Sequence, residues 1–308
     1  MSARPPQLDD DRDIFALVCA YNEAIVGIPD YTLEEVRDEL SRPHFVPDTD
    51  GWLVHDGDRA IGYAVAELTP DSDRVAIDVL SLDADVAAWL LDRAVERARE
   101  VGRERGHPRV TVDHSTYRDD EQLHRLLAQR GFSAATSFYR MRIDHHGPVD
   151  EPVMPPGVGL RSCAEGDAVR RAAHDVREES FVEHYGHTAE PYEEWVTSLE
   201  YRTSFSWEHV RLAEDDGEPV GMIRVSDQFV EDERCGYVAQ IGVLPSARGR
   251  GIAKAMLRSA FAADAARGLD GTLLHVDSSN TTPALGLYQS VGMRTILVIE
   301  AWSIELAP

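Results

Sequence analysis

The sequence has little cysteine and no long hydrophobic run. Three cysteines occur among 308 residues, at Cys19, Cys163 and Cys235. Their odd number and wide spacing argue against a disulfide framework or a Cys-x-x-Cys metal site, so we expect reduced packing residues. No apolar stretch approaches the ~18 residues that a membrane-spanning helix needs. The N-terminal residues lack the apolar core of a signal peptide, so we expect a cytoplasmic protein without a membrane partner.

Lysine is nearly absent, and metal-ligand patterns are missing. Lys254 is the single lysine among 31 basic residues, which face 55 Asp plus Glu, for a formal net charge of −24. A chain this acidic repels nucleic acid and anionic membranes and attracts small cations. The 12 histidines form no His-x-x-Glu-His pattern, so no metal is predicted.

Length and internal repetition predict two domains. A length of 308 residues is about twice that of a typical domain, and 43% of the residues are hydrophobic. Segment 56–62 resembles 216–221, and 110–132 resembles 273–293, at an offset of about 160 residues. Residues 146–157 are rich in Pro and Gly and predict a linker. We therefore expect an α/β (α+β) fold with mixed sheets, in which one unit occurs twice, over residues 1–145 and 158–308.

Residues 238–257 combine a short apolar run, a turn rich in Arg and Gly, and an amphipathic helix. The run ends at Pro245, which cannot continue a central strand, and Gly249 and Gly251 allow a tight bend. Apolar residues recur at helical spacing from Ile252, so the glycines precede a helix N-terminus. Free N–H groups and a partial positive charge at such a terminus favour a diphosphate.

The same stretch is free of acids. No carboxylate occurs between Arg234 and Ala263, where the overall composition would place about five. The window also contains Arg248, Arg250, Lys254 and Arg258. We interpret it as a site for an anionic ligand. The glycine spacing fits neither a Walker A loop nor a dinucleotide fingerprint.

This pattern resembles the Arg/Gln-x-x-Gly-x-Gly/Ala signature of the GNAT superfamily of acetyl-CoA-dependent acetyltransferases. Arg248, Gly251 and Ala253 occupy the signature positions. The resemblance implies a GNAT domain over 158–308 that uses acetyl-CoA as co-substrate and no metal. The cofactor-binding residues that it implies are Ile241, Gly242, Val243, Arg248, Gly249, Arg250, Gly251, Ile252, Ala253 and Asn280.

A second segment, 275–293, also resembles GNAT proteins, in which an Asn contacts the pantetheine or phosphate arm and a helix Tyr lies near the thioester sulfur. Asn280 and Tyr288 take these places. The resemblance implies that Tyr288 protonates the coenzyme A thiolate after a primary amine has attacked the thioester directly, in a ternary complex. A backbone N–H of the strand around Gly242 would hold the oxyanion. We expect that losing Tyr288 slows the reaction about 10²-fold and leaves cofactor binding intact.

The N-terminal copy lacks these features. Residues 76–89 contain no glycine and place Asp83 and Asp85 at the expected start of a helix. Two carboxylates there would repel a diphosphate and cap the helix instead. Leu127 takes the place of Tyr288. We therefore expect a degenerate copy that keeps the fold without the cofactor.

The general base and the acceptor site are less well defined by the sequence. Base candidates are the acids of 231–233, His275 and Asp277, and the choice among them stays open. The acceptor-binding candidates are His184, Tyr185 and Tyr237. The first two lie in the early helical region that borders the acceptor groove of GNATs, and Tyr237 directly precedes the apolar run of the cofactor strand.

The tandem layout resembles the mycothiol synthase family, which carries a base Glu at the position of Tyr237 here. This departure favours a GNAT N-acetyltransferase with another small-molecule amine as acceptor, for which the acidic chain would suit a cationic compound, in a monomer or homodimer. Mycothiol synthase proper is one alternative. The other is a non-catalytic protein that binds or senses acyl-CoA.

Overall fold

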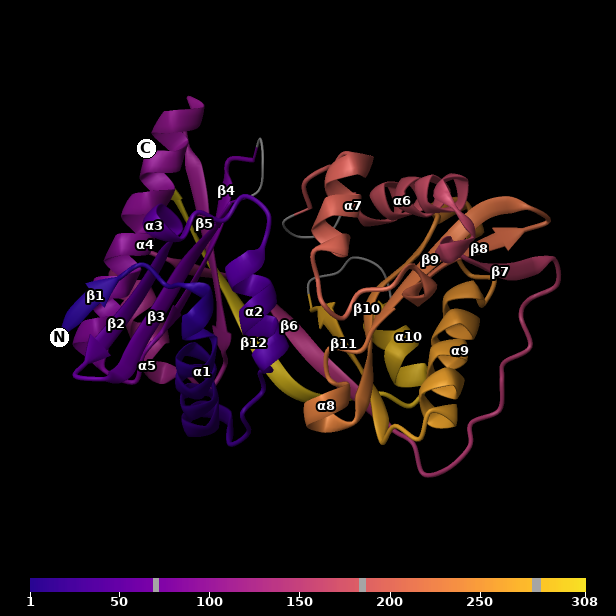
Figure 1. Cartoon of the computed structure of the whole chain (residues 1–308). Helices are drawn as coiled ribbons and strands as arrows, with labels where there is room; N and C mark the ends of the chain where they lie inside the picture. The colour runs from indigo at the N-terminus through magenta and orange to yellow at the C-terminus, as the bar shows by residue number, and fades with distance from the viewer. Residues whose placement is uncertain (69–71, 183–186, 279–283) are drawn as a thin grey trace. The chain divides into compact units, whose positions relative to one another are not determined.

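The computed structural model describes residues 1–68, 72–182, 187–278 and 284–308. Its chain divides into two compact units (Figure 1). Unit 1 comprises Met1–Ser137 and Val298–Pro308, and unit 2 comprises Phe138–Leu297.

The helices and strands, in chain order, are β1 (Ser2–Arg4), α1 (Asp11–Val26), α2 (Leu33–Ser41), α3 (Pro47–Asp50), β2 (Gly51–Asp56), β3 (Arg59–Leu68), β4 (Arg74–Leu80), α4 (Ala84–Arg105), β5 (Val110–Tyr117), α5 (Glu121–Gln129), β6 (Ser133–Asp144), β7 (Val158–Ser162), α6 (Asp167–Phe181), α7 (Tyr192–Glu200), β8 (Val210–Asp215), β9 (Glu218–Ser226), α8 (Val230–Glu233), β10 (Cys235–Val243), α9 (Ile252–Ala266), β11 (Gly271–Asp277), α10 (Ala284–Ser290) and β12 (Arg294–Leu306).

The two units repeat one strand order. Neighbouring strands in unit 1 are β1, β2, β3, β4, β5 and the end of β12, and in unit 2 they are β7, β8, β9, β10, β11 and the end of β6. β4 and β5 pair in parallel, as do β10 and β11. The other neighbours within each unit pair antiparallel. The predicted mixed α/β fold with a repeated unit is confirmed.

The last strand of each sequence repeat pairs in the sheet of the other unit. β6 ends the first repeat, yet Phe138–Asp144 pair with β11. β12 ends the second repeat, yet its residues from Ile299 pair with β5. The compact units therefore do not follow the predicted boundaries at 145 and 158, because strand pairing depends on which sheet edge is open and not on repeat similarity. The boundaries by repeat stay a prediction, and residues 145–157 contain no helix or strand, as a linker would.

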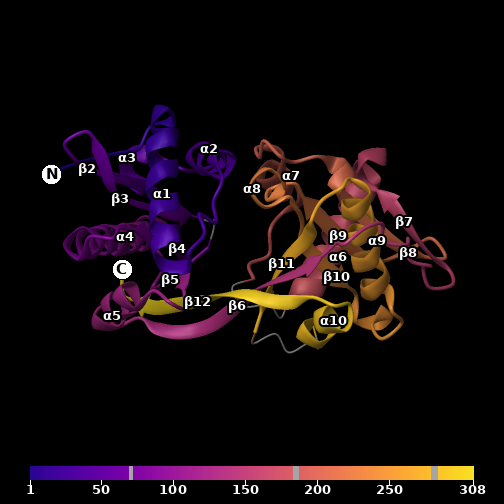
Figure 2. The same ribbon diagram turned by 90° about the horizontal axis from the view of Figure 1, so that it is seen from below.

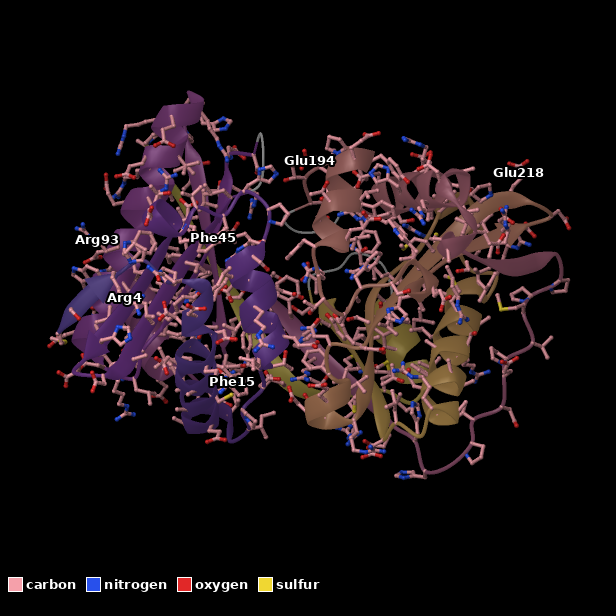
Figure 3. The ribbon with its side chains drawn as sticks, viewed as in Figure 1. Arg4, Phe15, Phe45, Arg93, Glu194 and Glu218 are labelled. Carbon is pink, nitrogen blue, oxygen red and sulfur yellow. The ribbon has the colours of Figure 1, made fainter. Side chains whose placement is uncertain are left out.

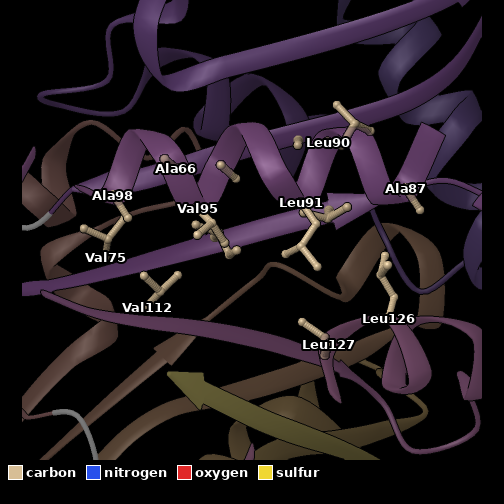
Figure 4. Packing of buried hydrophobic residues seen from close by; sticks show 14 of the residues in the cluster. Ala66, Val75, Ala87, Leu90, Leu91, Val95, Ala98, Val112, Leu126 and Leu127 are labelled. Carbon is tan, nitrogen blue, oxygen red and sulfur yellow. The ribbon is translucent and has the colours of Figure 1, made fainter. Parts of the chain in front are cut away.

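Helix α4 forms the main core of unit 1. Its apolar positions recur at helical spacing, so Leu90, Leu91 and Ala94 face one side and are fully buried. They pack over β4 and β5, where Val75 and Val112 are also fully buried (Figure 4). Unit 1 thus builds a complete hydrophobic core around the helix that corresponds to α9 of unit 2.

Helices cover both faces of the sheet in unit 2. α6 and α7 lie on one face of β8–β10, and α9 and α10 lie on the other (Figures 1 and 2). Side chains of a strand alternate between faces, so Met222 packs into the α6 cluster, while Ile223 packs into the α9 cluster. This alternation decides which β9 and β10 side chains lie on the α6 face.

A tight hairpin turn joins β8 and β9. Asp216 and Gly217 have φ values of 50° and 90°, and Asp215 pairs with Glu218 across the turn. Positive φ at both central residues is typical of a two-residue hairpin, which favours an Asp-Gly pair. Glu218, which begins β9, is labelled in Figure 3.

Candidate active site

Strands β10 and β11 separate halfway along their length. Their parallel register runs from Cys235 beside Gly271 to Val238 beside Leu274. β10 continues along β9 as far as Val243, with a register shift between Val238 and Gln240. The second half of β10 therefore pairs on the β9 side alone, and a pocket opens on the side toward β11.

The turn after β10 leads into α9 through two glycines in the left-handed region. Gly249 has a φ of 78°, and Gly251, the N-cap residue of α9, has a φ of 81°. A side chain at either position would be strained, which explains the glycines. Since Gly251 has no side chain to cap the helix, the first-turn N–H groups of α9 are left for a ligand. The predicted helix start at Ile252 is confirmed.

The corresponding helix of unit 1 is capped by its own sequence. Asp83 is the N-cap of α4 and accepts hydrogen bonds from the backbone N–H groups of Asp85 (2.9 Å) and Val86 (3.0 Å). Leu127, predicted to replace Tyr288, is fully buried in the core. The carboxylate therefore occupies the groups that α9 leaves open.

The pocket has a volume of about 520 Å³ and begins at the open end of α9. Of the predicted cofactor residues, those that line it are Ile241, Gly242, Val243, Arg248, Gly249, Gly251, Ile252 and Ala253. Tyr237 and Tyr288 line it as well. Asn280, His184 and Tyr185 lie outside the described residues.

The two predicted arginines are engaged by the protein itself. Arg248 donates from Nε to the carbonyl oxygen of Val243 at 3.1 Å, which ties the turn to the end of β10. Arg250 forms a two-pronged ion pair with Asp215, at 2.5 and 3.1 Å. Arg250 lines a neighbouring cavity of about 850 Å³ beside residues 149–156. To reach a phosphate in the first pocket, Arg250 would have to leave Asp215.

Gly242 is needed for close packing of β10 on α6. A Cβ atom at this position would lie 2.8 Å from the Cβ of Ser180 and 3.1 Å from the ring of Phe181. Both of these α6 residues line the pocket. Ser180 and Phe181 shortly precede the acceptor-binding candidates His184 and Tyr185 in the sequence, and only the packing identifies them as pocket residues.

Tyr288 lies on α10 and is 7% exposed. Burial raises the pKa of Tyr288 to about 12, and the nearby Tyr237 contributes in the same direction. The hydroxyl therefore keeps its proton at neutral pH. This is the protonation state that a general acid requires.

Tyr237 and His275 meet on the pocket wall. Tyr237 Oη and His275 Nδ1 share a hydrogen bond of 3.0 Å, and the two rings lie edge to face at an interplanar angle of 75°. Burial, with a smaller effect of the Arg140 guanidinium, lowers the pKa of His275 to about 4. The imidazole is thus neutral at physiological pH.

The other base candidates differ in their surroundings. Glu233 forms ion pairs with Arg140 and, at 3.6 Å, with Arg142. Asp277 is 7% exposed and lines the pocket. The structure thus brings His275 and Asp277 to the pocket that contains Tyr288, whereas Glu233 is neutralised by two arginines.

Two further findings concern metal-ligand groups and membrane-spanning helices in the described residues. Within 1–68, 72–182, 187–278 and 284–308, no group of three or more His, Cys, Asp or Glu could hold a metal ion. No helix in these ranges is long and apolar enough to cross a membrane.

The helix start that follows two glycines is the geometry that the sequence predicted, and the structure adds the separation of β10 from β11 beside it. Residues 171–293 match the sequence model of the family described as "Acetyltransferase (GNAT) family". The matched residues include the pocket-lining parts of β10, α9 and α10.

Among curated proteins, the chain is similar to mycothiol acetyltransferases. It is 33% identical to that of Thermobispora bispora over 176 residues, which cover 54% of this chain and 57% of the relative. It is 26% identical to that of Kocuria rhizophila over 290 residues, which cover 90% and 88%. The aligned part thus spans little more than half of the Thermobispora protein.

Solved structures share the whole architecture. The GCN5-related N-acetyltransferase from Sphaerobacter thermophilus is 25% identical, with a TM-score of 0.82 over 100% of this chain and 96% of the other. A tandem GNAT protein from the clavulanic acid biosynthesis pathway has the same fold, at 16% identity and a TM-score of 0.73, covering 100% and 99%. The chain thus shares its two-unit fold with both of these proteins.

Proposed function

We propose that the protein is an N-acetyltransferase that moves the acetyl group of acetyl-CoA to the primary amine of a small molecule. The observation that carries this proposal is one pocket of about 520 Å³ that joins the open N-terminus of α9 to the buried hydroxyl of Tyr288. Unit 2 alone would bind the cofactor, since Asp83 closes the corresponding helix end in unit 1.

The residues at the start of α9 fit a diphosphate. Both glycines leave open space, because a Cβ atom on Gly249 or Gly251 would meet nothing within 4 Å. The first-turn N–H groups and the positive end of the helix dipole would hold the anion. Lys254 lines the pocket and would add a positive charge for the diphosphate. Lys254 lies in the acid-free stretch, where the sequence alone assigned it no role.

The reaction forms a bond between the amine nitrogen and the acetyl carbon and breaks the bond from that carbon to sulfur. The amine loses one proton, and the departing thiolate gains one. Tyr288 would give the second proton, since its pKa of about 12 keeps it protonated. A backbone N–H from the part of β10 that faces away from β9 would stabilise the oxyanion, an interaction worth about 3 kcal/mol.

The raised pKa of Tyr288 sets a condition on this step. Against a free thiol pKa of about 8.5, full transfer from a group of pKa about 12 is uphill by roughly 5 kcal/mol. If the departing thiolate lay in the same pocket, burial would raise its pKa as well and reduce this difference. Proton donation would therefore accompany cleavage of the carbon–sulfur bond.

We infer that the acceptor differs from that of the mycothiol acetyltransferase relatives. Tyr237 occupies the position at which the sequence resemblance expects a base Glu. Its hydrogen bond to the neutral His275 makes this pair the candidate that could accept the amine proton in place of that Glu.

The test compares wild type with Tyr288→Phe. We expect amine-dependent release of free thiol from acetyl-CoA to fall about 10²-fold in the variant, while acetyl-CoA affinity measured by calorimetry stays the same. Leu287→Ala, the adjacent pocket-lining substitution, serves as a matched control for disturbance of α10. Equal thiol release by wild type and Tyr288→Phe would refute the acid role. Binding of acetyl-CoA without thiol release for any amine would favour an acyl-CoA sensor.

A further inference from the structure

We propose that Arg224 and Gln240 form a subsite for a carboxylate of the acceptor, so that the acceptor is an amino acid or another small amine that carries a carboxylate. The inference rests on the proposed acetyltransferase function and names the substrate class of that site. Arg224 lies on β9 directly opposite Gln240 of β10.

The first argument is the direction in which Arg224 projects. Met222, two residues earlier on β9, packs with the α6 and α7 cluster, and alternation along a strand puts Arg224 on the same face. Gln240 lines the pocket, and Arg224 donates to its side-chain oxygen over 3.4 Å. Arg224 itself does not line the pocket but lies one hydrogen bond behind Gln240, so a ligand carboxylate that displaced the Gln240 side chain would meet the guanidinium.

The second argument is the lack of a counter-charge. Arg224 is partly buried, and within the described ranges no carboxylate lies within ion-pair distance of it. The side-chain hydrogen bond of Arg224 goes to a neutral amide, although Asp and Glu outnumber Lys and Arg by 55 to 31 in this chain. A partly buried guanidinium is costly without an anion, so a ligand carboxylate would supply the counter-charge that the described residues do not place beside it.

The third argument is the local field. Burial lowers the pKa of Arg224 to about 10; the Arg202 guanidinium, with the largest charge effect, and the Arg177 guanidinium lower it too, while Tyr237 and Glu190 raise it. Arg177 is paired with Glu178 and with Glu190. The surroundings of Arg224 are thus positive within an acidic molecule, and they favour an anion where net charge alone predicted a cationic acceptor.

The fourth argument is proximity to the reacting groups. Tyr237 acts electrostatically on both Arg224 and Tyr288, so it lies near each of them. Tyr237 and Gln240 line the same pocket as Tyr288. In an amino acid, the amine and the carboxylate are separated by only a few bonds. An amino acid whose carboxylate is held at Arg224 would therefore place its amine where it can approach the thioester.

The experiment measures binding of paired acceptors to the protein saturated with coenzyme A. The pairs are L-alanine, β-alanine, L-glutamate and L-lysine, each with its carboxamide, and calorimetry gives Kd for each compound. We expect at least one acid to bind about 10- to 100-fold more tightly than its amide in wild type, which is the range for hydrogen bonds to a charged group. Arg224→Gln should abolish the preference, and Arg224→Lys should restore part of it, because lysine keeps the charge without the planar fork.

Arg211→Gln is the matched control. Arg211 lies one strand away on β8 opposite Ile223, so it projects from the other face of the sheet, and it is exposed. Its substitution should leave the preference unchanged. A wild type that does not prefer any acid over its amide, including one that binds neither, overturns the inference. So does a preference that survives Arg224→Gln. Calorimetry with acetyl-CoA on the same samples separates this failure from a failure of the proposed function, in which acetyl-CoA itself would not bind.

Discussion

Replacing Gly242 with Ala tests how closely β10 and α6 approach. The added Cβ would lie 2.8 Å from the Cβ of Ser180, 3.0 Å from its Oγ and 3.1 Å from the ring of Phe181. Favourable separations between such atoms are about 3.5–4.0 Å. Ser180 is 8% exposed, and its Cβ is attached directly to the α6 backbone, so the strain can be relieved only by moving the helix.

The expected cost follows from this geometry. Overpacking of a well-packed interior destabilises proteins by about 1–3 kcal/mol. For a unit of this size each kcal/mol lowers Tm by about 2–4 °C, so Gly242→Ala should lower Tm by about 2–12 °C. Gly242, Ser180 and Phe181 all line the pocket, so the affinity for acetyl-CoA should fall as well. Thermal unfolding and calorimetry measure the two effects.

Two further variants test whether the contact between residue 242 and Ser180 causes the loss of stability. Gly159→Ala on β7 is a control, because its Cβ would meet nothing within 4 Å and its φ is not positive. It should leave Tm unchanged within about 1 °C. Ser180→Gly removes the clashing atom, so the double variant should regain most of the stability lost by Gly242→Ala. A Gly242→Ala protein that melts with the wild type, or no recovery in the double variant, would show that the contact does not limit the packing.

The ion pair and the buried acid of unit 2 lead to two more predictions. Asp215→Asn releases Arg250 from its ion pair and should strengthen acetyl-CoA binding about two- to fivefold. Calorimetry measures this change in Kd. An unchanged Kd would mean that Arg250 does not reach the cofactor. Burial raises the pKa of Asp264 to about 6, against the opposing hydrogen bond from Thr272 at 2.5 Å. An unfolded Asp ionises near 3.9, so between about pH 4 and pH 6 the folded state holds the proton more tightly, and stability falls as pH rises through this window. Asp264→Asn removes the ionisation. It should therefore increase the free energy of unfolding at pH 7 by up to roughly 3 kcal/mol and raise Tm there, with little gain at pH 4. A pH-independent difference in Tm would contradict this account.

Local sequence rules predicted the parts of the site that depend on a few adjacent residues. Gly249 and Gly251 predicted a bend and a helix start, and both have positive φ in the structure. Asp83 predicted a capped helix in the other repeat, and its carboxylate accepts the expected backbone hydrogen bonds. Such features follow from conformational preferences and from the unpaired N–H groups at a helix end, which are encoded within one turn of chain.

Contacts between distant parts of the chain could not be predicted. The assignment of Arg250 to the cofactor stays a prediction, and the structure adds that its guanidinium is held by Asp215, 35 residues away along the chain. The hydrogen bond between Tyr237 and His275 joins two strands 38 residues apart. The hydrogen bond of Arg224 with Gln240 depends on the register of β9 against β10.

The sequence alone determined the type of site: a glycine-rich turn before an uncapped helix, an acid-free surrounding stretch, and a tyrosine downstream. Tertiary structure decided which arginines are already paired, which side chains share the pocket wall, and which sheet receives the last strand of each repeat. The physical reason is that helix starts and turns are fixed by neighbours in the chain. Strand exchange, ion pairs and pocket walls depend instead on which edges and faces the folded sheet brings together.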